Sequence, residues 1–275
     1  MNTRCTEIAI ANLSLLTYEL PQDGPAHQRI IPSMTSRTLP RFALICLLAS
    51  LLCTPRPASA QVSSTGDVSP SVVSPNWAVG GVLFVGGEFA DGTLTIATGG
   101  TVTNTNASLG SQNSPRSGVV NVTGGTWTNS GSLRIGEDGD GTLNISAGSV
   151  TSSSGSVGGF GAPGVVNVTG GSWANASTLD LGNHTSGTLI ISGTGIVSAS
   201  NVSFGISQFN GGWLNLNGGG TLQTGQISKG IGTGTISFNG GTYKAAAALP
   251  NLFNGFLTGS ITLDAGGGTI DTNGY

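Results

Sequence analysis

A phrase of about ten residues recurs along this chain at nearly constant spacing. Two copies, GVVNVTGGTW and GVVNVTGGSW, are almost identical and start 46 residues apart. The phrase or a weaker relative of it begins at seven places: Gly92, Gly118, Gly141, Gly164, Gly187, Gly212 and Gly234. The successive steps are 26, 23, 23, 23, 25 and 22 residues, so the near-identical copies are two periods apart. A period of this length is the signature of a chain that stacks one structural unit on the next.

The start of each unit predicts a short strand followed by a corner. Apolar residues fall two and four places after the leading glycine in all seven units: Leu94 and Ile96, Val120 and Val122, Leu143 and Ile145, Val166 and Val168, Leu189 and Ile191, Leu214 and Leu216, Ile236 and Phe238. Such alternation is typical of a strand with one buried face. Glycine then stands at the seventh offset in six units: Gly99, Gly125, Gly148, Gly171, Gly219 and Gly241. Glycine suits a corner because it accepts positive φ without strain.

Two further strands complete the predicted unit. The second strand is marked by one apolar residue per unit: Val102, Trp127, Val150, Trp173, Ile196, Leu222 and Tyr243. The third is written as LRIG at 133–136, LDLG at 179–182 and VSFG at 202–205, and Gly110 and Gly159 hold the same closing offset. Trp77, Leu83, Val85 and Gly86 fit a degraded unit that begins near Val68.

Three strands per period predict an all-β, right-handed parallel β-helix with about 23 residues per coil and roughly eight coils. The hand follows from the strong preference of parallel connections for a right-handed crossover. An antiparallel sandwich and a propeller are the alternatives. A sandwich does not require identical offsets at a fixed period, and a propeller blade takes about 40 to 50 residues.

The first 60 residues are of a different kind. From Met34, Arg37 and Arg41 form a basic leader, residues 42–52 form a largely apolar run, and Ala-Ser-Ala at 58–60 is a small-residue cleavage site. This order predicts a signal peptide at 34–60, with export through the Sec pathway and Gln61 as the first mature residue. The apolar run is shorter than the roughly 20 residues of a membrane span, so we expect no membrane span in the mature chain.

Residues 1–33 have no place in this signal. They are either an extended leader or the product of an upstream start codon, in which case Met34 is the true start. We expect residues 61–67 to be a short linker and residues 68–275 to be the β-helix repeat domain, truncated at its C-terminus. All three cysteines, Cys5, Cys46 and Cys53, fall in the segment to be removed. The mature chain would then contain no cysteine, so we expect an exported protein that is not held by disulfides.

Charge excludes two classes of partner. After residue 60, four basic residues face nine acidic ones, which gives a net charge of −5. The mature chain has no basic patch for nucleic acid or for an anionic membrane surface.

The C-terminal part carries a family resemblance. An NGGT strand followed by Lys244-Ala245-Ala246, an apolar linker, and AGGGTIDTNG at 265–274 resembles the passenger regions of bacterial autotransporters, in particular their passenger-associated β-strand repeats. The resemblance covers about residues 68–275. It implies a β-helix at the cell surface or outside a Gram-negative bacterium, carried outward by a C-terminal translocator barrel in the outer membrane. That barrel is absent from this sequence, which leaves a fragment, a truncated gene or another secretion route as alternatives.

The sequence offers no residue set that predicts catalysis, and we name no catalytic, cofactor-binding or metal-binding residue. Glycan hydrolysis needs paired carboxylates, and the single acidic cluster is Glu137-Asp138-Gly139-Asp140. As a calcium loop it lacks further ligands and a distal glutamate, so we interpret it as a solvated turn. His184, the only histidine after residue 60, is interpreted as a surface residue.

Asparagine and tryptophan recur at fixed positions of the repeat. Asn121, Asn144, Asn167 and Asn215 share the third offset and are expected to form an outward asparagine ladder. Trp127 and Trp173 either belong to the core or form an aromatic surface for carbohydrate, and the apolar residues at this position in other coils favour the core.

We therefore expect a non-enzymatic passenger-type β-helix that acts as a spacer, adhesin or matrix component outside the cell. Its expected partners are host matrix, glycans or other cell-surface components. The alternative is a carbohydrate-active or carbohydrate-binding β-helix whose site is incomplete in this chain.

Overall fold

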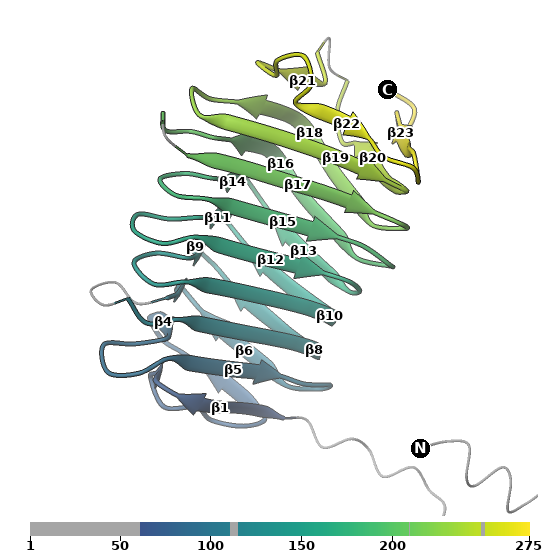
Figure 1. Cartoon of the computed structure of the whole chain (residues 1–275). Coiled ribbons are helices and arrows are strands. Elements are labelled where there is room, and N and C mark those ends of the chain that lie inside the picture. The colour runs from purple at the N-terminus through teal and green to yellow at the C-terminus, as the bar shows by residue number, and fades with distance from the viewer. Residues whose placement is uncertain (1–60, 111–114, 209, 249–250) are drawn as a thin grey trace, which may run out of the picture. The chain divides into compact units, whose positions relative to one another are not determined.

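The computed structural model describes residues 61–110, 115–208, 210–248 and 251–275 (Figure 1). The predicted upstream segment 1–33 and signal peptide 34–60 lie outside the described residues. The described residues belong to one compact unit and consist of strands and turns without a helix. Accordingly, none of the described residues belongs to a helix with the length and apolar character of a membrane span.

The strands line up on three faces. The first face holds β5 (Gly92–Ile96), the first halves of β8 (Gly118–Asn129) and β10 (Gly141–Ser152), β12 (Gly164–Val168), β15 (Gly187–Ile191), β17 (Gly211–Asn217), β19 (Thr233–Asn239) and β22 (Ile261–Leu263). The second face holds β3 (Asn76–Ala78), β6 (Thr101–Asn104), the second halves of β8 and β10, β13 (Ser172–Asn175), the first halves of β16 (Ile196–Phe204) and β18 (Thr221–Lys229), β20 (Gly241–Ala245) and β23 (Gly268–Asp271). The third face holds β4 (Val82–Val85), β7 (Asn106–Leu109), β9 (Ser132–Ile135), β11 (Ser154–Val157), β14 (Thr178–Leu181), the second halves of β16 and β18, and β21 (Phe253–Asn254).

Each strand pairs in parallel with the strand one coil away, in the register that the repeat predicts. Gly118 stands beside Gly92 and Gly141, and the column of leading glycines continues unbroken to Gly234. The coils climb in a right-handed sense from the N-terminal end at the bottom of Figure 1 to the C-terminal end at its top. The predicted right-handed parallel β-helix of about eight coils is confirmed.

The predicted inward positions form one apolar core. All fourteen residues two and four places after the leading glycines are at most 3% exposed. Trp127 and Trp173 are fully buried, so both side chains face inward and belong to the core. The aromatic carbohydrate surface considered for this pair is ruled out, because a buried ring has no face to offer a ligand.

Four predicted positions are wrong by one residue. Ile196 is 45% exposed, and Val197 points inward in its place, fully buried. The reason is a longer first corner: Gly195 donates its N–H to the carbonyl of Ser192 in a turn that delays the next strand by one residue. Similarly, Gly158 rather than Gly159 takes the left-handed corner after β11, with φ of 79°. At the first corner, positive φ falls on Gly124 (146°) and Gly240 (89°) rather than on the predicted Gly125 and Gly241.

The N-terminal end is closed by strands that run against the rest. β1 (Val62–Gly66) pairs antiparallel with β5, and β2 (Val68–Ser69) pairs antiparallel with β4. Val62 is buried against the core. Residues 61–67 are thus largely a strand rather than the expected linker, and the parallel coils begin with β3 rather than near Val68.

Candidate functional site

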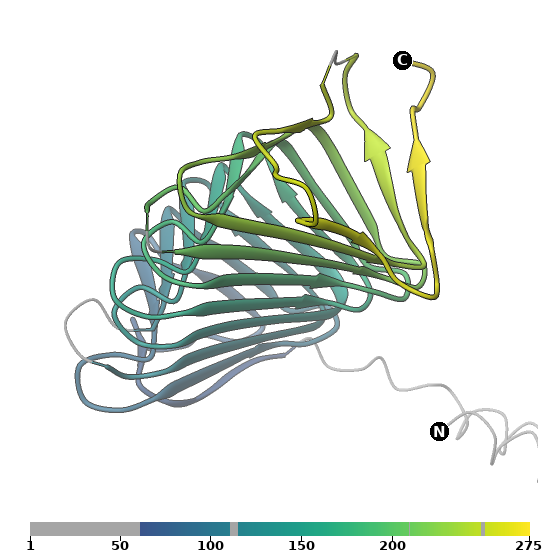
Figure 2. The same cartoon turned by 45° about the horizontal axis from the view of Figure 1, so that its top comes forward.

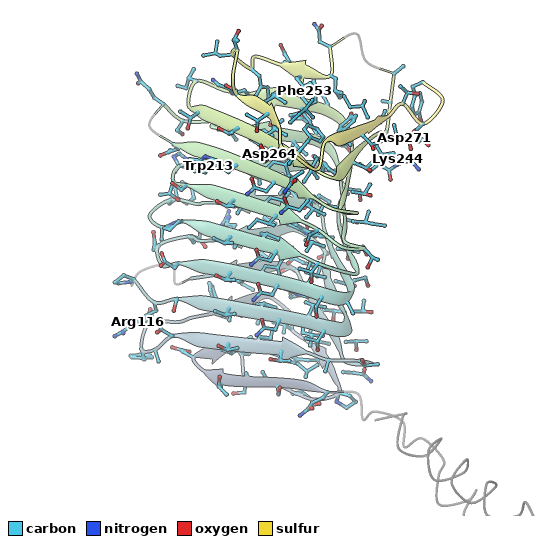
Figure 3. All side chains as sticks on the ribbon, turned by 45° about the vertical axis from the view of Figure 1, so that its right-hand side comes forward. Arg116, Trp213, Lys244, Phe253, Asp264 and Asp271 are labelled. Carbon is cyan, nitrogen blue, oxygen red and sulfur yellow. The ribbon has the colours of Figure 1, made fainter. Side chains whose placement is uncertain are left out.

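Charged side chains gather along one edge of the β-helix. We call this edge the third corner, formed by the turns that leave the third face, at residues 86–91, 115–117, 136–140, 158–163, 182–186, 205–208, 230–232 and 255–260. It holds Glu88, Asp91, Arg116, Glu137, Asp138, Asp140 and His184, and Figure 3 shows Arg116 projecting from this edge. On the first two faces, the described outward residues from Thr93 to Gln223 include no charged side chain. Along this stretch the charged groups therefore lie on the third face and its corner.

Glu137 is a structural anchor within this corner. Its side chain is almost fully buried and pairs with Arg134, whose Nη1 lies 3.1 Å from Glu137 Oε1. The hydroxyl of Ser108, in the preceding coil, donates to Glu137 Oε2. The prediction of a solvated acidic turn is therefore wrong for Glu137, which is buried because it joins two coils. Asp140 of the same cluster is exposed.

Two further carboxylates, Asp91 in this corner and Asp67 near it, accept hydrogen bonds from the backbone. Asp91 Oδ1 accepts the N–H of Ser117 at 2.9 Å, and Asp67 Oδ2 accepts the N–H of Phe89 at 3.2 Å. Across the described residues, no three Asp, Glu, His or Cys side chains converge as a metal site would require. These carboxylates hold turns in place, which is the common use of an acceptor oxygen beside free backbone N–H groups.

A column of polar residues runs up the third face beside this corner. Arg134, Ser156, Asp180 and Ser203 occupy successive coils in direct register. Burial raises the pKa of Asp180 above its ordinary value of 3.8, and a hydrogen bond with Ser203 partly opposes the rise. Within the described structure, the buried hydroxyl of Ser156 has no hydrogen-bond partner. A carboxylate made more basic beside an unpaired hydroxyl is the arrangement in this column closest to a reactive pair.

An exposed aromatic platform lies on the same corner. The rings of Phe160 and His184 stack with their centroids 4.7 Å apart and their planes 18° from parallel. His184 is exposed, as predicted, and Phe160 is 62% exposed. The platform rests on fixed turns, since Thr185 Oγ1 donates to the carbonyl of Ala162 at 2.5 Å. Sequence reasoning missed Phe160, although its 24-residue spacing from His184, about one period, is the signal that places the two side by side.

The asparagine ladder forms over three coils. Asn144 Nδ2 donates to Asn121 Oδ1, and Asn167 Nδ2 donates to Asn144 Oδ1, both at 2.9 Å. Asn215 does not join, because Ile190 occupies the rung between it and Asn167. These two hydrogen bonds link three successive coils along the first face.

No family model, curated protein or solved structure matches this chain.

Proposed function

We propose that residues 61–275 form a non-catalytic β-helix that is secreted or displayed on the surface of a Gram-negative bacterium, where it acts as a spacer and adhesin. The predicted Sec signal at 34–60 and the resemblance to autotransporter passengers support the location. The adhesive surface in this proposal is the third corner, and its partners are host matrix or glycans.

The observation that carries the proposal is the uneven distribution of charged side chains among the three faces and their corners. A continuous apolar core and paired strands form the scaffold, and the described outward residues of its first two faces from Thr93 to Gln223 are uncharged. Along this stretch the charged groups are concentrated on the third corner and the third face, and Phe160 and His184 stack at that corner, whereas Trp213 is an exposed ring on the first face. Glu137, in contrast, forms an ion pair with Arg134 and accepts a hydrogen bond from Ser108. Its carboxylate therefore has a structural role, since a buried charge must be paired.

Binding assays on glycan arrays and host-matrix proteins test this function directly. We expect residues 61–275 to bind at least one ligand, and the double substitution F160A/H184A to weaken that binding about tenfold, since one lost aromatic contact is worth about 1.4 kcal/mol. The matched control is T128A/T151A, at outward uncharged positions of the second face, where binding should be unchanged. Absence of binding to every ligand, or equal loss in both variants, would contradict the proposal.

A carbohydrate-active β-helix is the second candidate, favoured by Asp180 beside the unpaired hydroxyl of Ser156. Release of reducing ends from bacterial or host polysaccharides measures it. We expect no release; release that disappears in Asp180→Asn while the fold persists would establish the enzyme instead.

A further inference from the structure

The turns of the third corner are stacked along one edge of the β-helix (Figure 2) and differ in charge along that edge. The first three turns, at 86–91, 115–117 and 136–140, hold Glu88, Asp91, Arg116, Glu137, Asp138 and Asp140. The next three turns, at 158–163, 182–186 and 205–208, contain no Asp, Glu, Lys or Arg. They hold the neutral amides of Asn183 and Gln208 and the rings of Phe160 and His184. An uncharged stretch with exposed rings therefore follows the charged part of this corner.

Trp213 adds another exposed ring beside these turns. Its side chain is 37% exposed, whereas the other three tryptophans of the chain are at most 3% exposed. An added Cβ at Gly211 would overlap Cη2 of Trp213, so the indole is turned back over the start of β17, towards the third corner. Figure 3 shows Trp213 and Arg116 along the same edge. Because β15 and β19 pair with β17 on its two sides, this exposure belongs to the side of the β-helix.

We call residues 158–163, 182–186 and 205–208, together with Trp213, the aromatic edge. We propose that the aromatic edge binds an extended, uncharged polysaccharide chain whose sugars stack on the Phe160–His184 pair and on Trp213. This inference rests on the proposed adhesive function and names the class of its ligand. A pyranose ring packs its C–H groups on an aromatic ring, while its hydroxyls require amide or hydroxyl partners. Aromatic surface with a few polar groups is the usual composition of a ligand site.

The spacing of the rings fits such a chain. The turn with His184 leads into β15, and Trp213 lies in β17, which pairs directly with β15. Phe160 precedes β12, the strand on the other side of β15. Neighbouring strands lie about 4.8 Å apart, which is close to the length of one sugar in an extended β-1,4-linked glycan. A chain parallel to the axis of the β-helix therefore reaches from Phe160 to Trp213 with about three sugars.

Hydrogen-bonding groups lie on the turns between the rings. The hydroxyl of Ser207 is 3.4 Å from Nδ1 of His184. Asn183 is half-buried and Gln208 is exposed, and within the described structure neither side-chain amide is used in a hydrogen bond. Both amides are therefore available to the hydroxyls of a sugar.

Charge favours an uncharged glycan over an acidic one. The carboxylate of Asp138 lies beside the turn that carries Phe160, since an added Cβ at Gly161 would be 3.1 Å from Asp138 Oδ1. The three turns of the aromatic edge contain no Lys or Arg that would pair with a uronate or a sialate. An acidic sugar would therefore meet repulsion without a counter-charge. Binding of an uncharged chain should be insensitive to added salt.

Isothermal titration calorimetry of residues 61–275 with β-1,4-linked oligosaccharides of glucose, mannose, xylose and N-acetylglucosamine tests the ligand class. We expect at least one series to bind, with an affinity that rises up to about three sugars and then levels off. Trp213→Ala should weaken this binding about tenfold, and Trp213→Phe, which keeps a ring, should weaken it less. Ile196→Ala is the matched control and should bind like the parent, because Ile196 is an exposed apolar residue on the second face.

Acrylamide quenching of tryptophan fluorescence keeps the test decisive if Trp213→Ala unfolds the protein. The other three tryptophans are buried, so acrylamide should quench mainly Trp213 in the free protein. A saturating oligosaccharide should reduce this quenching in the parent, and the reduction should be absent in Trp213→Phe. Unchanged quenching at saturation would show that the sugar does not cover Trp213 and would overturn the proposal.

Two comparison ligands separate this inference from the proposed function. Oligogalacturonate represents acidic glycans, and collagen represents matrix proteins. Binding to either one that F160A/H184A weakens, without binding to any uncharged series, would overturn the inference and leave the proposed adhesive function standing. An uncharged series that binds Trp213→Ala as tightly as the parent would also overturn the inference alone. Absence of binding to every ligand would overturn both.

Discussion

Trp127 donates its indole N–H to Oδ1 of Asn104, 2.6 Å away and one coil nearer the N-terminus. Asn104 in turn donates through Nδ2 to Oδ1 of Asn129 and, at 2.7 Å, to the carbonyl of Asn106. A second inward tryptophan repeats the arrangement, with Trp173 Nε1 3.1 Å from Ser152 Oγ. Buried polar side chains at the end of the second face therefore satisfy the polar atoms of the largest core residues, as buried polar groups require.

The two tryptophans should respond differently to the same substitution. Trp127→Phe leaves the buried acceptor of Asn104 without its indole donor. In contrast, Trp173→Phe leaves Ser152 still donating to Asn175 Oδ1 at 2.6 Å. Both variants lose similar packing, so we expect Trp127→Phe to be the more destabilised by about 1 kcal/mol. Urea unfolding followed by circular dichroism measures the difference, and equal midpoints would show that the Asn104 bond contributes nothing net.

Glycine at the first corner is required by backbone conformation. Gly148 has φ of 84°, and an added Cβ would lie 2.2 Å from the carbonyl oxygen of Gly125. We expect Gly148→Ala to lower the free energy of unfolding by about 2 kcal/mol or more, because strain and a backbone clash combine. Gly218→Ala is the control, since nothing lies within 4 Å of its added Cβ. If both variants melt like the parent, the coils are more compliant than this geometry implies.

The asparagine ladder predicts a position-dependent effect. Asn144→Ala breaks two ladder hydrogen bonds at once, as acceptor from Asn167 and donor to Asn121. We expect a loss of about 1 to 2 kcal/mol, at the modest net value of about 1 kcal/mol per bond in a half-buried site. Asn215→Ala has no ladder bond to lose and should change stability little. Chemical unfolding of both variants decides the point, and a larger effect at Asn215 would contradict it.

Asp180 makes stability depend on pH. Its pKa is raised above 3.8, chiefly by burial, so the folded protein holds more protons than the unfolded chain between the two pKa values. The contribution of Asp180 to the free energy of unfolding therefore falls as the pH rises from the unfolded pKa to the folded pKa. Above the folded pKa, burial of the charged carboxylate disfavours folding. We expect Asp180→Asn to unfold at higher urea than the parent at pH 7, with the difference vanishing below pH 3.8. The exposed Asp140→Asn is the control, and a less stable Asp180→Asn at pH 7 would refute the prediction.

Periodicity made the fold predictable because each offset has one role. Alternating residues such as Leu143 and Ile145 can be buried on the same side only in a strand. Repetition at a fixed spacing then stacks them in columns. The corners were less predictable, because a turn of one extra residue exchanged Ile196 for Val197, and sequence alone does not reveal which turn a run such as SGTG adopts.

The candidate site was predicted only in part. The sequence located the acidic cluster and the exposure of His184, because charge is a local property of the chain. It did not reveal that Glu137 is buried, since its partners include Ser108 in another coil. The stack of Phe160 on His184 was equally hidden, as it depends on how two irregular turns align.

The sequence by itself determined the repeating unit, the three faces and the hydrophobic core of this protein, because those follow from the spacing of apolar residues and glycines. Only the tertiary structure decided the direction of Trp127 and Trp173, the antiparallel closure by β1 and the burial of Glu137. These features depend on contacts between residues of different coils, and a periodic pattern of residue types carries no information about such contacts.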